Sequence, residues 1–141
     1  MTSAEDSPDD YRLRQLKQSS GGLFSELEFL EVETKDTATL ERGVLFLMAF
    51  WSGPAVVGLG NLCRVLGNAG LPPGFVFRVL DIDGASKALL ERLSKFPIRI
   101  GGNGEAYWFC GGEIFAMTSV ATASDAKILE LLKDAAAGPG A

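Results

Sequence analysis

Hydrophobic and polar positions divide the chain into segments with the periods of strands and helices. Residues 44–51 form a continuous apolar run of strand length, which residues 52–54 interrupt. An uninterrupted apolar run is typical of a strand buried on both faces, and a proline suits the first turn of a helix. From residue 55 onward, apolar residues recur at helical intervals on one face, made of Val56, Leu59, Leu62, Cys63 and Leu66. The pattern predicts a central strand, a sharp turn and a helix.

The remaining segments predict strands and helices in alternation. Residues 23–32 alternate in polarity and then slip phase at Leu30, which predicts an outer strand with a bulge near that residue. Glycines 111 and 112 before Glu113 predict a tight antiparallel hairpin. The other expected elements are a helical turn over 37–42, a strand over 75–82, helices over 87–96 and 124–133, and hairpin strands over 106–110 and 114–118. Strand, helix, strand in this order implies a parallel pair joined by a right-handed crossover.

Charge and polarity divide the chain into three parts. Residues 1–41 hold ten acids and four bases, whereas residues 42–141 hold eight acids and nine bases. We expect residues 1–22 to be an acidic and largely flexible segment, with a short polar helix over 9–18. Residues 23–134 are expected to form one α/β domain with a single core, and residues 135–141 a flexible tail.

The composition excludes several classes of function. The net charge is −5 and no Lys or Arg cluster is present, which argues against nucleic acid as a partner. Histidine is absent, so the chain has no Ser-His or Cys-His pair and no His-ligated metal. We therefore expect no metal and no cofactor. Residues 43–63 carry no charge, but Asn61, the interruption at 52–54 and several glycines argue against a membrane span.

The two cysteines are expected to be buried core residues rather than partners in a disulfide. Cys63 and Cys110 are 47 positions apart. We expect the chain to carry no signal peptide. Free cysteine is among the most buried residue types. These features indicate a reducing cytoplasm as the location of the protein.

The turn after the central strand resembles the thioredoxin superfamily. In that family the strand runs into Trp-Cys-Gly-Pro-Cys, and here the turn reads Trp51-Ser52-Gly53-Pro54-Ala55. Three weaker similarities follow in the family's order, namely Asp-Ile-Asp at 81–83, Lys-Phe-Pro-Ile-Arg at 95–99 and the glycines before Glu113. The resemblance spans about residues 25–134. It implies a thioredoxin-like domain, with a mixed sheet of four or five strands and helices on both faces.

The resemblance also implies that the redox chemistry of the family is missing. A dithiol reductase needs a thiolate at a helix N-terminus and a second, resolving cysteine. Ser52 and Ala55 stand at those positions, and Phe46 replaces the family's buried acid. The family's cis-proline falls within residues 100–104, which lack proline. In a second alignment Pro97 is that residue.

Three functions are compatible with these features. The first is a non-catalytic module that binds a protein or an extended peptide, as chaperone-like accessory, scaffold or neutralising partner. Its binding groove would be made of the motif turn and the facing loop, that is, Trp51, Ser52, Gly53, Pro54, Gly101, Gly102, Asn103 and Gly104. The second is a one-cysteine thiol enzyme that uses Cys63 or Cys110. The third is a structural subunit of a homo-oligomer, in which Trp51 is buried by a second copy.

Overall fold

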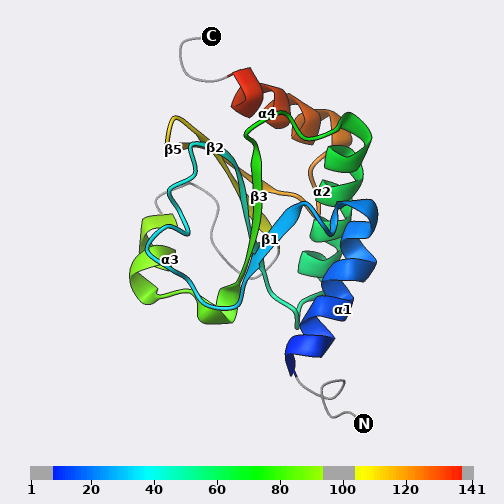
Figure 1. Ribbon diagram of the computed structural model, residues 1–141, viewed down its shortest axis with the longest axis vertical. Coiled ribbons are helices and arrows are strands. Elements are labelled where there is room, and N and C mark those ends of the chain that lie inside the picture. The colour runs from blue at the N-terminus through cyan, green and yellow to red at the C-terminus, as the bar shows by residue number, and fades with distance from the viewer. Residues whose placement is uncertain (1–7, 94–103, 138–141) are drawn as a thin grey trace.

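The structure is a three-layer α/β domain built on a five-stranded mixed sheet (Figure 1). It is a computed structural model, and it describes residues 8–93 and 104–137. Helices α1, α2 and α4 cover one face of the sheet and α3 covers the other. The elements are α1 (Pro8–Ser20), η2 (Gly21–Leu23), β1 (Leu27–Leu30), β2 (Arg42–Met48), α2 (Gly53–Ala69), β3 (Val76–Asp81), η3 (Ile82–Gly84), α3 (Lys87–Leu93), β4 (Glu105–Cys110), β5 (Glu113–Ser119) and α4 (Asp125–Ala137).

The strand order places β2 at the centre of the sheet. The order is β1-β3-β2-β4-β5, in which β1, β2 and β3 are parallel and β4 and β5 are antiparallel to their neighbours. Consequently the three parallel strands end, and β4 begins, on the same side of the sheet. We call this side the motif edge; it carries residues 51–54, η3 and Gly104.

Alternate side chains of β2 belong to two separate core layers. Val44, Phe46 and Met48 pack with α1, α2 and α4, whereas Leu45 and Leu47 pack with α3. All five side chains are fully buried. The continuous apolar run is therefore a central strand covered on both faces. The predicted α/β class, with a mixed sheet and helices on both faces, is confirmed.

The domain extends beyond the expected boundaries at both ends. Residues 8–20 form helix α1, and Leu16 of this helix is fully buried in the same core layer as α2. The segment that we expected to lie outside the domain therefore contributes to its core. At the other end α4 continues to Ala137, and Ala135 is fully buried. A mostly polar helix with one buried leucine gives too weak a periodicity to be assigned to the core from sequence.

Two local predictions differ from the structure. The expected bulge at Leu30 is absent: β1 pairs with β3 in unbroken register, and Leu30 breaks the polarity pattern because it packs under α3. A register shift occurs instead in β5, where Phe115 is an extra residue opposite Trp108 and Phe109. The helical turn expected over 37–42 is a turn over 35–38, since Arg42 already belongs to β2.

Candidate functional site

The motif turn joins the central strand to a capped helix. Ser52 has an extended backbone, with φ −112° and ψ 121°, and its Oγ accepts a hydrogen bond from the Ala55 N–H at 3.4 Å. Pro54 lies in the first turn of α2, where its missing N–H leaves no hydrogen bond unmade. A serine N-cap followed by proline is a strong start signal for a helix. The strand, turn and helix predicted from the sequence are all present.

The residue that leads into β4 lies directly against this turn. Gly104 has φ +91°, and a Cβ built on it would lie 3.3 Å from Ala55 Cα and 3.4 Å from the Pro54 carbonyl oxygen. A glycine is required here both by the backbone conformation and by the close approach to α2. The structure thus brings Gly104 together with the predicted turn. Gly101, Gly102 and Asn103, which we also predicted, lie outside the described residues, as does Pro97.

Carbon atoms fill the space beneath the turn. Ala55 and Phe46 are fully buried, and the Phe46 Cζ lies 3.5 Å from the position of a Cβ on Gly104. Ser52 is only 9% exposed, and its hydroxyl is engaged in the helix cap. The Phe46 ring and the backbone of Ala55 therefore both lie against Gly104.

The outer surface of the turn is apolar and exposed. Trp51 is 65% exposed, and Gly53 and Pro54 are also exposed. Val57, one helical turn after Gly53, is 55% exposed. We call Trp51, Gly53, Pro54 and Val57 the motif patch. Sequence analysis missed Val57. It could have been found because it is an apolar residue of this helix that lies outside the predicted buried face.

Neither cysteine lies at the motif turn. Cys63 is buried in the middle of α2, and burial raises the pKa of its thiol from 9.0 to about 12. Cys110 is partly buried at the end of β4, on the side of the sheet opposite the motif edge. Both thiols are free. Ionisation of Cys63 is strongly disfavoured because a thiolate would lose its hydration there.

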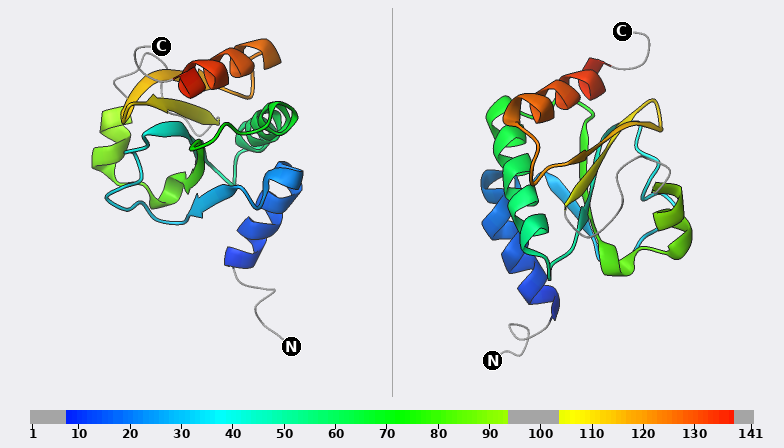
Figure 2. Two further views of the ribbon diagram at one scale, coloured as in Figure 1. Left: turned by 45° about the horizontal axis from the view of Figure 1, so that its top comes forward. Right: turned by 180° about the vertical axis from the view of Figure 1, so that it is seen from behind.

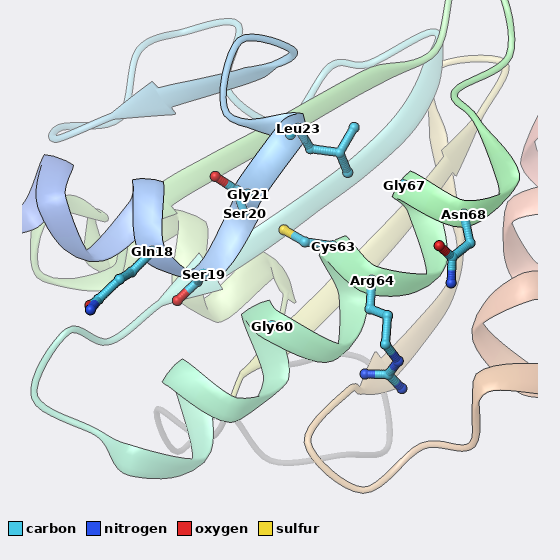
Figure 3. Close-up of a pocket in the computed structure, with 11 residues that line it drawn as sticks. Gln18, Ser19, Ser20, Gly21, Leu23, Gly60, Cys63, Arg64, Gly67 and Asn68 are labelled. Carbon is cyan, nitrogen blue, oxygen red and sulfur yellow. The ribbon is translucent and has the colours of Figure 1, made fainter.

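An open groove of about 490 Å³ lies between α2 and the end of α1 (Figure 3). The Cys63 sulfur points across it toward Ser20 and Gly21, whereas the Arg64 side chain turns away from α1. Arg64 instead contacts Asp125 of α4 at 2.5 Å. The groove is lined by glycines, by polar side chains, by Leu23 and by one buried thiol.

Comparison with known proteins shows the fold of the chain but does not assign it to a family. No family model matches the chain, and no curated protein sequence matches it. Three solved thioredoxin structures are similar to it. Plasmodium falciparum thioredoxin has a TM-score of 0.55 at 14% identity, and the match covers 77% of this chain and 98% of that one. The Schistosoma mansoni thioredoxin pre-protein in its reduced state gives 0.56 at 18%, covering 78% and 98%.

Thioredoxin O1 from Arabidopsis thaliana in its oxidised state gives a TM-score of 0.53 at 17% identity, covering 78% of this chain and 97% of that one. The domain thus has a thioredoxin-like fold. Within residues 8–93 and 104–137, no helix has the length and apolar character that crossing a membrane would need. The uncharged stretch that raised this question is divided between β2 and the first part of α2.

Proposed function

We propose that the protein is a non-catalytic, thioredoxin-like module of the cytoplasm that binds another protein through the motif patch. The observation that carries this proposal is the 65% exposure of Trp51 at the motif turn. Tryptophan is enriched at binding hot spots, and exposed apolar side chains gathered at one place typically mark an interaction surface. The partner is expected to present an extended segment with at least one large apolar side chain.

The chemistry of the turn supports binding rather than catalysis. Ser52 is the residue best placed for nucleophilic attack, but its hydroxyl accepts the capping hydrogen bond and the chain has no histidine to act as a base. The thiol-enzyme alternative is least favourable for Cys63, whose thiol stays protonated because it is buried. The apolar surface needs no thiol to bind a side chain.

A peptide-binding experiment tests this function. We suggest screening a library of short unstructured peptides against the whole chain and measuring affinity for the best binder by fluorescence. Trp51 is the informative tryptophan because Trp108 is fully buried. Trp51→Ala is expected to weaken binding at least about tenfold, as expected for a hot-spot residue. Its stability in urea should stay within about 0.5 kcal/mol of the parent, since the side chain is largely exposed.

Phe115→Ala is the matched control, because Phe115 is an exposed aromatic residue (40%) in β5, close to the end of the sheet opposite the motif edge. It should bind the same peptide with unchanged affinity. If Phe115→Ala and Trp51→Ala weaken binding equally, the motif patch is not the binding surface. A homo-oligomer would show itself differently, by a mass that rises with concentration and falls in Trp51→Ala.

A further inference from the structure

Helix α1 is attached to the domain through few apolar contacts. It lies beside α2 over the same face of the sheet (Figure 2). Among the apolar side chains of residues 11–20, only Leu16 is fully buried, whereas Tyr11 is 50% and Leu13 is 38% exposed. An isolated helix of 13 residues is marginal in water. The position of α1 therefore depends on a small number of specific contacts.

The most specific of these contacts is made by Arg12. Its Nη1 lies 2.5 Å from Asp81 Oδ2 and its Nη2 lies 3.0 Å from Glu31 Oε1. Asp81 is the last residue of β3 and is only 3% exposed, and its other oxygen accepts the Asp83 N–H at 2.9 Å. Removing the guanidinium would leave a buried carboxylate without its cation, which is strongly unfavourable. Arg12 thus fastens α1 to the motif edge.

An open groove lies at the other end of α1. It has a volume of about 490 Å³ and lies between residues 18–23 and α2 (Figure 3). A Cβ built on Gly60 would meet no atom within 4 Å, apart from the backbone of its own helix. Cys63 lies at the bottom of this groove, is only 4% exposed and faces the end of α1. The C-terminal end of α1 therefore covers the thiol at the margin of an open groove.

We propose that α1 is a displaceable cover, locked by Arg12 to Asp81 and Glu31, which opens independently of the rest of the domain and exposes Cys63. Segments with few buried apolar contacts open at a lower free energy than the whole domain unfolds. Opening leaves the sheet, α2 and α4 folded. The Cys63 thiol and the face of α2 around it then become accessible to solvent and to thiol reagents.

Thiol labelling kinetics test the cover. Full-length protein with Cys110→Ser has one thiol. The rate at which this thiol reacts with dithiobis(nitrobenzoate) reports the exposure of Cys63. Arg12→Ala in this background is expected to label about tenfold to a hundredfold faster, because an unpaired buried carboxylate favours the open state. Glu31→Gln removes only the exposed partner and should accelerate labelling about twofold to fivefold. Lys127→Ala, which breaks an exposed ion pair with Glu130 in α4, is the control and should leave the rate unchanged.

Urea unfolding of the same variants separates local opening from global unfolding. The cover is supported if labelling of the parent is faster than its global unfolding equilibrium allows, and if Arg12→Ala increases that excess. Equal labelling rates for Arg12→Ala and Lys127→Ala would overturn it. An acceleration accounted for entirely by lost global stability would overturn it as well. If Arg12→Ala does not fold, Glu31→Gln decides, and a rate equal to that of the control contradicts the proposal.

Discussion

A cysteine placed at the helix cap should regain the acidity that the redox members of this fold require. The perturbation is Ser52→Cys in a background that also carries Cys63→Ala and Cys110→Ser. The new thiol is then the one cysteine that can react. The new thiol would occupy the N-cap of α2, where the Ala55 N–H now donates to Ser52 Oγ. The first turn of this helix contains no acidic residue whose negative charge would repel a thiolate and raise its pKa.

The expected size of the effect follows from this position. A negative charge at a helix N-terminus gains about 0.3–1 kcal/mol, and up to about 2 kcal/mol where it is partly buried. One pKa unit corresponds to about 1.36 kcal/mol, so the thiol pKa should fall by about 0.2–1.5 units below the usual value of about 8.5. The low exposure of Ser52 acts in the opposite direction, since desolvation disfavours the thiolate. We expect the dipole and the N–H donor to prevail, giving a pKa between about 7 and 8.3.

The pKa is measured from the pH dependence of the alkylation rate by iodoacetamide. Ser25→Cys in the same background places a thiol at an exposed position and serves as the reference, with an expected pKa of about 8.5. A pKa for the Ser52→Cys variant equal to or above that of the reference would refute the reasoning. In that case the N-terminus of α2 would not stabilise a thiolate. The similarity to a redox active site would then be limited to the backbone fold.

Two further predictions concern stability. Gly43→Ala should lower the free energy of unfolding by about 3 kcal/mol or more, because its Cβ would lie 2.2 Å from the Val76 carbonyl oxygen between β2 and β3. Urea unfolding measures this loss. A loss below about 1 kcal/mol would show that β2 can shift. The stability contributed by the protonated Cys63 is fully present below pH 9.0 and is lost above it, by about 1.4 kcal/mol per pH unit, because the unfolded chain ionises at its ordinary pKa while the folded chain does not until about pH 12. Cys63→Ala should flatten this decline in urea unfolding measured on both sides of pH 9.0, and an unchanged slope would mean that Cys63 is accessible in the folded state.

The fold could be predicted because short-range sequence patterns specify its central strand, turn and helix. The apolar run of β2, the Ser-Gly-Pro turn and the helical spacing in α2 are signals within a short stretch, and the structure contains all three elements. The same stretch contains Trp51 and Ser52, both of which we predicted to line the binding groove. In the structure Trp51 is exposed and Ser52 caps α2. Gly104 was predicted as a site residue only through the family resemblance. Its close approach to Pro54 depends on how distant segments fold together, which no local sequence pattern shows.

The role of the N-terminal segment could not be predicted, because its contacts are distant in sequence. Arg12 and Asp81 are 69 positions apart, and each looks like an ordinary surface charge when it is considered alone. Leu16 is one apolar residue in a polar helix, so its burial depends on the face that α2 offers. Charge composition suggested a flexible acidic arm, whereas Arg12 and Leu16 connect the helix to β3 and to the core.

The central claim is that the domain binds an extended peptide through the exposed motif patch and does so without a thiol. Amide and indole NMR spectra recorded during titration with a bound peptide test it most directly. We predict shift changes at the Trp51 indole and at the Gly53 and Gly104 amides, with the Trp108 indole unchanged, both in the parent and after Cys63→Ser and Cys110→Ser. Changes confined to another surface, or binding that disappears when the two cysteines are replaced, would contradict the account.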